Sequence, residues 1–163
     1  MPTLPGPAAR LRRLVRSVSD RLRWLPPTVA RLTIGLVFLQ TGWGKVHNIQ
    51  KVVGFFTDLG IPAPELQARL AASAELACGA LILIGLFTRV ATLPLIVTMT
   101  VAILTAKRGD IHELTDLLGM EEYLFIVALL WLGAYGAGPL SFDALLARRL
   151  DTGERPVPRT AEA

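Results

Sequence analysis

Four long apolar blocks constrain the fold of this chain more than any other feature. They cover about residues 28–46, 66–88, 90–106 and 123–136, and charged or Gly/Pro-containing stretches separate them. An α-helix rises about 1.5 Å per residue, so about 20 apolar residues cross a hydrocarbon core of about 30 Å. Only 18% of the residues are charged, whereas soluble domains carry about 25%. We therefore predict an all-α membrane protein, a four-transmembrane-helix bundle; a soluble helical protein is the alternative.

Basic residues gather at the two ends of the chain. Arginines precede the first block and follow the last one, at Arg10, Arg12, Arg13, Arg16, Arg21, Arg23, Arg148, Arg149, Arg155 and Arg159. Basic residues that flank membrane spans tend to stay on the cytoplasmic side, beside anionic lipid. We therefore predict that both termini and Arg89 are cytoplasmic, with His47 and His112 on the outer side. This placement accounts for the net charge of +4 without nucleic acid as a partner.

The sequence divides into three predicted regions. In residues 1–27, apolar residues recur at helical spacing among the arginines, at Leu11, Leu14, Val15, Val18 and Leu22. This pattern predicts a basic amphipathic helix on the inner leaflet, with a disordered basic arm as the alternative. Residues 28–146 form the predicted transmembrane domain, with short interfacial helices near residues 52–59 and 110–122. Residues 147–163 are predicted to be a cytoplasmic tail without fixed structure.

Glu75 lies near the middle of the second apolar block. A charged side chain at the centre of a membrane helix costs about 3 kcal/mol or more, so such residues face the bundle interior and find a partner. The candidate partners are Lys45, toward the outer end of the first block, and Arg31, toward its inner end. Lys45 is the nearer in expected depth. Glu75, Lys45 and Arg31 thus form a predicted intramembrane polar site, which either binds the head of a small lipophile or relays a proton, or is a structural ion pair.

The outer acidic segment offers a weaker candidate site. His112, Glu113 and Asp116 are residue types that ligate divalent metals. No paired-histidine spacing accompanies them, so a solvated interfacial surface is the favoured interpretation. The single cysteine, Cys78, excludes two-thiol chemistry within the chain and is expected to be a small buried side chain. No sequence motif for a nucleophile, phosphate loop or redox centre is present, so we assign no catalytic residue.

The end of the fourth block carries a folding signal. Gly136, Gly138 and Pro139 are expected to stop the helix. Ser141 is expected to cap a following turn, and Asp143, near its start, favours the dipole of the next helix.

Four stretches of the sequence together resemble the DoxX family of small four-helix bacterial membrane proteins. The stretches are RLTIGLVFLQTGWGKV, GFFTDLGIPAP, ELACGALILIGLFTRVAT and GAGPLSFDALL, and the resemblance covers about residues 30–146. Its motif positions are Arg31, Gly35, Gly42, Lys45, Gly60, Pro62, Glu75, Gly79, Gly85, Arg89, Gly138, Ser141 and Asp143. The motifs are specific to the family, but they do not specify an activity.

The resemblance implies a multi-pass protein of the bacterial inner membrane. It also implies a subunit of a quinone- or respiratory-linked oxidoreductase system, with a quinone as the candidate cofactor. Beside the lipid bilayer, the expected partners are soluble or membrane oxidoreductase subunits, and self-association stays open. Because no catalytic motif is present, the chain is at most a subunit of such an enzyme. A non-catalytic scaffold for assembly, or a carrier for a small solute or a metal, are the alternatives.

Overall fold

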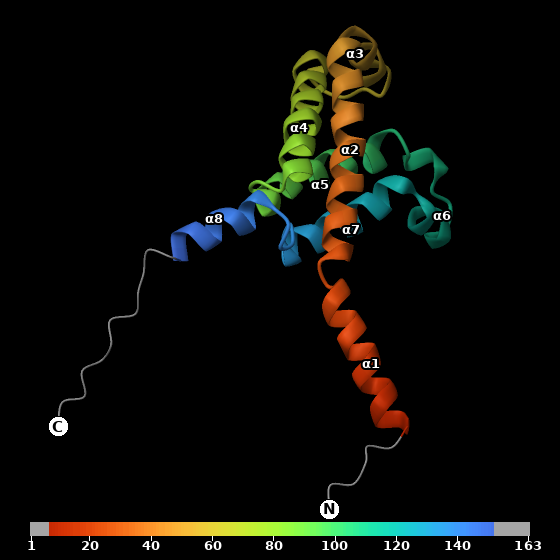
Figure 1. The fold of residues 1–163 in the computed structure, drawn as a ribbon. Coiled ribbons are helices and arrows are strands. Elements are labelled where there is room, and N and C mark those ends of the chain that lie inside the picture. Colours follow the sequence, from red (N-terminus) through yellow and green to blue (C-terminus); the bar gives the residue numbers. More distant parts are fainter. Residues whose placement is uncertain (1–6, 152–163) are drawn as a thin grey trace, which may run out of the picture.

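The computed structural model describes residues 7–151, and these fold into helices with no β-strand among them (Figure 1). The elements in chain order are α1 (Pro7–Leu22), α2 (Leu25–His47), α3 (Ile49–Asp58), α4 (Pro64–Ile84), α5 (Thr88–Thr105), the 3₁₀ turn η1 (Arg108–Asp110), α6 (Leu114–Gly119), α7 (Glu121–Tyr135) and α8 (Phe142–Asp151). The predicted all-α class is confirmed, and α2, α4, α5 and α7 correspond to the four apolar blocks.

Three of these helices are long and apolar enough to cross a membrane: α2, α4 and α5. The first span belongs to a helical stretch that runs from Val15 to His47. The fourth predicted span, α7, has 15 residues, which makes it about 22 Å long. It is shorter than a hydrocarbon core of about 30 Å, so α7 crosses only where the bilayer thins or neighbouring elements complete the path.

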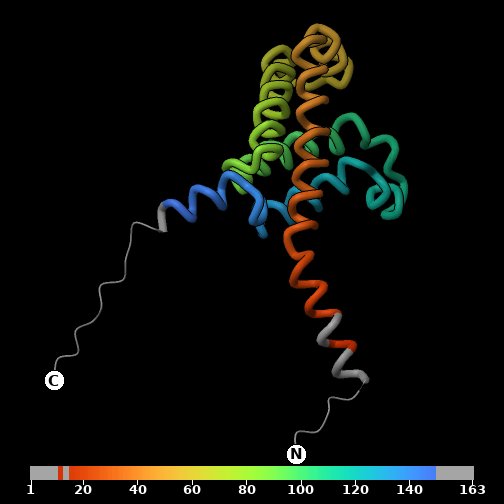
Figure 2. Tube along the Cα trace, in the orientation of Figure 1, coloured from red at the N-terminus to blue at the C-terminus, as the bar shows by residue number. Residues whose placement is uncertain are grey.

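The helices pack as two antiparallel pairs. α2 lies along α4, α5 packs on α7, and α4 joins the pairs by packing on α5. In Figure 1, α5 and α7 run across the α2/α4 pair. α1 continues from α2 away from the bundle, as the trace in Figure 2 shows. Residues 147–151 continue α8, whereas residues 152–163 of the predicted tail lie outside the described residues.

Glycines bring α2 and α4 into close contact. A Cβ atom at Gly35 would lie 2.7 Å from the backbone N and Cα of Leu83, and one at Gly79 would lie 2.6 Å from the backbone N of Leu39. Cβ atoms do not approach backbone atoms this closely, so the helix spacing depends on the missing side chains. Small residues serve this purpose in membranes, where lipid is as apolar as the helix surfaces.

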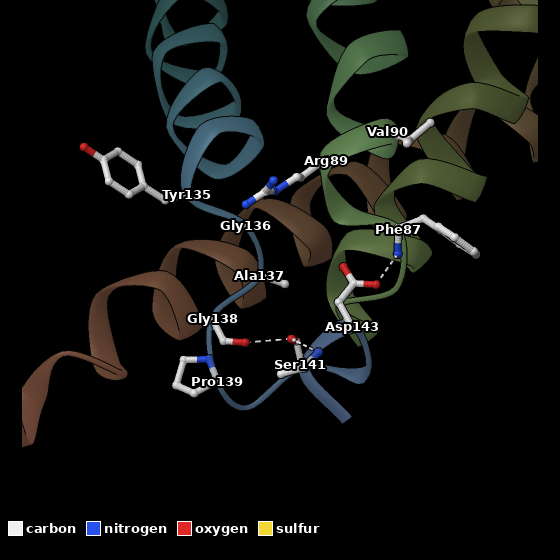
Figure 3. A pocket seen from close by; sticks show the side chains of 11 residues that line it. Phe87, Arg89, Val90, Tyr135, Gly136, Ala137, Gly138, Pro139, Ser141 and Asp143 are labelled. Atoms are coloured by element: carbon white, nitrogen blue, oxygen red, sulfur yellow. Dashed lines mark hydrogen bonds between the residues drawn. The ribbon is translucent and has the colours of Figure 1, made fainter. Parts of the chain in front are cut away.

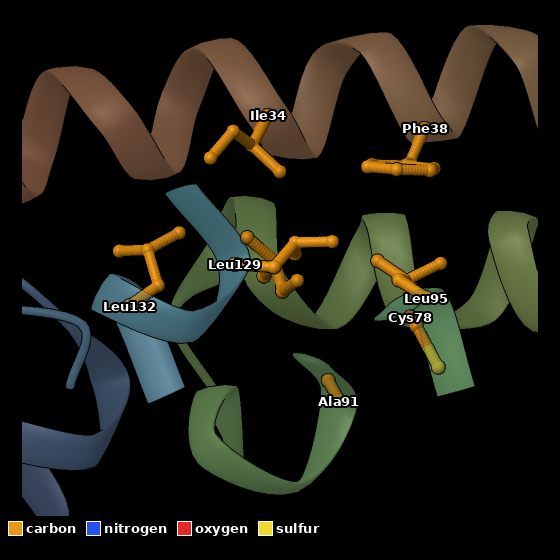
Figure 4. Close-up of a cluster of buried hydrophobic side chains, with 8 residues drawn as sticks. Ile34, Phe38, Cys78, Ala91, Leu95, Leu129 and Leu132 are labelled. Atoms are coloured by element: carbon orange, nitrogen blue, oxygen red, sulfur yellow. The ribbon is translucent and has the colours of Figure 1, made fainter. Parts of the chain in front are cut away.

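The hydrophobic core lies between α2, α4, α5 and α7 (Figure 4). Its buried members are Ile34, Phe38, Cys78, Ile82, Ala91, Leu95, Leu129 and Leu132. Phe38 also packs edge-on against Phe125, with 5.4 Å between the ring centroids. Cys78 is a buried member of this cluster, as expected for a small apolar side chain.

Candidate functional site

Glu75 lies on the buried face of α4 and forms an ion pair with Lys45 from the last turn of α2. Glu75 is 1% exposed, and the Nζ atom of Lys45 donates a hydrogen bond to its Oε1 atom over 2.5 Å. Gly42 explains the contact, because a Cβ there would collide with the backbone of Glu75 and Leu76. Lys45 follows Gly42 by three residues, so it points from the same face of α2 toward Glu75.

Only one of the two carboxylate oxygens of Glu75 takes part in the ion pair with Lys45. Its Oε2 atom is buried and has no hydrogen-bond partner among the described residues. A buried acceptor without a partner costs about 1–3 kcal/mol, and more when it is charged. The Lys45 side chain is 34% exposed, so its ammonium group keeps N–H groups that are not committed to Glu75. The pair therefore presents one free acceptor and further donors side by side.

Both residues line a cavity of about 830 Å³ beside the N-terminal half of α4. Side chains of α3 and of the residue after it line one wall: Val52, Phe55, Phe56 and Leu59. α5 and the residue after it line another: Pro94, Val97, Thr98, Met99, Val101, Ala102, Thr105 and Ala106. Its lining is mostly apolar, and its volume lies within the range of small-molecule sites, about 300–1,000 Å³. The arrangement is that of a site for an amphiphile, with an apolar body against α3 and α5 and a polar head at Lys45 and Glu75.

Arg31, the third residue of the predicted polar site, is not part of it. α2 and α4 are antiparallel, and their register places Arg31 beside Gly85, at the opposite end of α4 from the cavity. Gly85 lies ten residues beyond Glu75, or about 15 Å along the helix. Arg31 is 6% exposed, and its Nε and Nη1 atoms have no hydrogen-bond partner among the described residues.

Ser141 lies beside Gly85 at the same end of the bundle as Arg31, and Figure 3 shows Ser141 close to Asp143. The Ser141 hydroxyl accepts a hydrogen bond from the Ala144 N–H over 3.2 Å, which confirms the expected cap of α8. The Asp143 carboxylate instead accepts hydrogen bonds from Phe87 N–H over 2.8 Å and Thr88 N–H over 3.1 Å. The sequence correctly predicts Asp143 near the start of α8. It does not predict that the Asp143 side chain caps α5. Asp143 also attracts the Arg31 guanidinium electrostatically.

Replacing Asp143 with alanine should destabilise the protein by about 2 kcal/mol. An N-terminal cap contributes about 1 kcal/mol, and the buried Arg31 would lose its nearest negative charge. Asp143→Asn keeps an acceptor for one of the two N–H groups but not the charge, so it separates the contributions. Thermal unfolding in detergent measures both. Equal stability of Asp143→Ala and the wild type would show that the cap contributes nothing.

The outer acidic segment is used for helix capping. The Asp116 Oδ2 atom accepts hydrogen bonds from the His112 N–H over 3.0 Å and the Glu113 N–H over 2.9 Å. These hydrogen bonds lower the pKa of Asp116. No group of three or more His, Cys, Asp or Glu side chains in the described part of the chain is arranged to hold a metal ion. Glu113 and Asp116 form the capping box at the start of α6, and His112 directly precedes it.

The sequence model of the DoxX family matches residues 27–108. This stretch contains α3, α4, α5 and all but the first two residues of α2, and with them the ion pair and the whole lining of the Lys45–Glu75 cavity. The chain belongs to the DoxX family. Its apolar helices and its membrane-protein relatives make it an integral membrane protein. No solved structure matches the chain.

Three relatives show the range of proteins it is similar to. An uncharacterized membrane protein of Mycobacterium tuberculosis is 36% identical over 76% of this chain and 84% of its own length. The inner membrane protein YphA of Escherichia coli is 32% identical over 71% and 86% of the two chains. A Bacillus subtilis protein named "Putative oxidoreductase CatD" is 28% identical over 69% and 81%.

The polar residues that α5 contributes to the cavity were missed by the sequence analysis. Thr98 and Thr105 line the cavity and are seven residues apart, which places them on one face of α5. Two threonines at this spacing within an apolar block were the sequence signal that could have predicted a polar strip on α5. The aromatic residues of α3 do not predict a cavity, because any interfacial helix has an apolar face, whether that face contacts lipid or protein.

Proposed function

We propose that this DoxX-family protein is a membrane subunit of a quinone-linked oxidoreductase system and that its outer cavity holds a quinone-like headgroup. The observation that supports this most is the ion pair of the buried Glu75 with the partly exposed Lys45, in the wall of a mostly apolar cavity. One oxygen of the Glu75 carboxylate has no hydrogen-bond partner among the described residues. A ring with oxygen substituents matches this combination of an acceptor, donors and apolar walls. The name of the Bacillus relative supports the reaction class.

The roles of the two charged residues follow from their chemistry. The Lys45 ammonium can donate a hydrogen bond to a ring oxygen, and the Glu75 Oε2 atom can accept one from a ring hydroxyl. A bound quinone would supply the capacity to take up and release electrons, which partner subunits would deliver. Lys45 is partly exposed, so it also offers a path for a proton between the outer surface and the buried carboxylate.

The proposal includes an orientation in the bacterial inner membrane. The terminal arginines are the residues expected to remain in the cytoplasm. The Lys45–Glu75 cavity then opens in the outer half of the membrane, and Arg31, Arg89 and Asp143 lie toward the inner leaflet. Cysteine accessibility labelling at exposed positions in α3 and α8 tests this orientation.

Binding of a short-chain ubiquinone analogue to the protein in lipid nanodiscs tests the proposed site. Glu75→Gln should weaken binding about tenfold, because a hydrogen bond to a charged group is worth about 1.5–3 kcal/mol and the neutral amide keeps only part of it. Glu65→Gln is the matched control, since Glu65 is exposed in the first turn of α4 and does not line the cavity. If folded Glu75→Gln binds the analogue as tightly as the wild type, the Lys45–Glu75 ion pair has only a structural role.

A further inference from the structure

A second cavity, of about 560 Å³, lies at the other end of the bundle (Figure 3). The start of α5, the end of α7 and the loop into α8 form its walls. Its lining includes Phe87, Arg89, Val90, Tyr135, Gly136 and Asp143. It is separate from the Lys45–Glu75 cavity, with which it shares no lining residue.

Arg89 is the charged group that this cavity offers to a ligand. It forms no ion pair within 4.0 Å among the residues the structure describes. The one carboxylate in the lining, that of Asp143, is already engaged by the N–H groups of Phe87 and Thr88 and by the charge of Arg31. The Arg89 guanidinium therefore keeps its donors and its positive charge for another partner.

The guanidinium lies beside the end of α7. A Cβ atom at Gly136 would lie 3.5 Å from Nε and 3.7 Å from Nη2 of Arg89. Gly136 has a φ of +84°, a conformation that favours glycine, and it turns the chain out of α7 beside the guanidinium. Arg89 thus extends from the start of α5 toward the end of α7 and lines the cavity between them (Figure 3).

Exposed apolar side chains surround the cavity. Phe87 and Val90 are each 63% exposed and Tyr135 is 73% exposed. Tyr135 packs against Trp131, with 5.5 Å between the ring centroids. Tyrosine and tryptophan gather where the hydrocarbon core meets the lipid headgroups. An exposed apolar and aromatic rim around a cation is the combination typical of a site at headgroup depth.

We propose that this cavity binds the phosphate group of an anionic phospholipid through Arg89. An arginine fork matches a phosphate with two parallel hydrogen bonds. Basic pockets between helices on the cytoplasmic side hold anionic headgroups in this way. The apolar rim of Phe87, Val90 and Tyr135 favours a lipid over a free anion, because it would cover the first carbons of the acyl chains. The inference is independent of any ligand at Glu75.

The test is to measure lipid retained by the purified full-length protein, by native mass spectrometry after exchange into mixed phosphatidylglycerol and phosphatidylcholine. We expect at least threefold enrichment of phosphatidylglycerol on the wild type, falling toward none in Arg89→Gln and to an intermediate value in Arg89→Lys. Arg108→Gln is the matched control, since it removes the same charge from an exposed site at the other end of α5 that lines neither cavity.

Three results would overturn the proposal. One is equal retention of the two lipids by the wild type, which is informative even if a variant fails to fold. Another is unchanged enrichment in folded Arg89→Gln. The third is full displacement of phosphatidylglycerol by millimolar inorganic phosphate at constant ionic strength, which would make the cavity a site for a soluble anion. Weaker retention at high salt alone supports the proposal, because salt screens an exposed guanidinium.

Discussion

Gly42→Ala should destabilise the protein by about 3 kcal/mol and should abolish ligand binding at Glu75 at the same time. The added methyl group would lie 2.7 Å from the Cα atom of Leu76 and 2.9 Å from the carbonyl carbon of Glu75. Both are backbone atoms, which cannot turn away as a flexible side chain can. The helices must separate, and overpacking of this kind costs about 1–3 kcal/mol, occasionally more. Separation also draws Lys45 away from Glu75.

Gly44→Ala provides the control for this prediction. Gly44 lies two residues further along α2, and a Cβ atom there would have no heavy atom within 4 Å outside its own surroundings in the helix. Alanine favours a helix by about 1 kcal/mol over glycine, so this variant should be as stable as the wild type or more so. Unfolding in detergent measures both variants. Equal losses in the two would show that close contact between α2 and α4 does not hold the site together.

Lys45→Met should destabilise the protein by about 3 kcal/mol. Removing one partner of a buried ion pair leaves an uncompensated charge, which costs about 3–5 kcal/mol. The lower end applies here because the Lys45 side chain is 34% exposed and is partly solvated. Methionine keeps most of the length and apolar character of the lysine side chain. The expected loss of stability therefore comes from the missing charge and not from empty space left by a shorter side chain.

The double variant Lys45→Met/Glu75→Leu distinguishes a functional pair from a stabilising one. Buried ion pairs are often replaced by apolar residues at little cost or with a gain in stability. We expect the double variant to recover the stability lost in Lys45→Met and yet to bind no quinone analogue. A double variant as unstable as Lys45→Met would contradict this, because the loss could then not come from the unpaired carboxylate.

The four apolar helices α2, α4, α5 and α7 could be predicted because apolar length is a property of each segment by itself, although only α2, α4 and α5 are long enough to cross a membrane. The burial of Glu75 followed from the same argument, since a charge in an apolar block needs a protein neighbour. Its partner depended on the register of α2 against α4. That register is set by contacts between Gly35 and Leu83 and between Gly42 and Leu76, which pair Lys45 with Glu75 and leave Arg31 at the far end.

The cavities and the role of Asp143 depend on contacts between distant segments. The Lys45–Glu75 cavity exists because α3, packed on α4, closes a wall opposite α5, and no periodicity within α3 specifies where that helix lies. Asp143 has the spacing of a first-turn acidic residue in α8, which is the role that local sequence rules assign to it. Its contacts with Phe87 and Thr88 arise only when the chain folds back on the turn between α4 and α5.

The cap that Asp143 places on α5 links the beginning of that helix to a residue synthesised much later. Phe87 precedes Asp143 by 56 positions, so the hairpin of α4 and α5 enters the bilayer before its turn has received the carboxylate. Until then Arg31 has no counter-ion from that side. Insertion of the α4–α5 hairpin and formation of the Asp143 cap on α5 would thus be separate events during synthesis. A nascent chain halted before residue 143 would hold its spans in the membrane without the cap on α5.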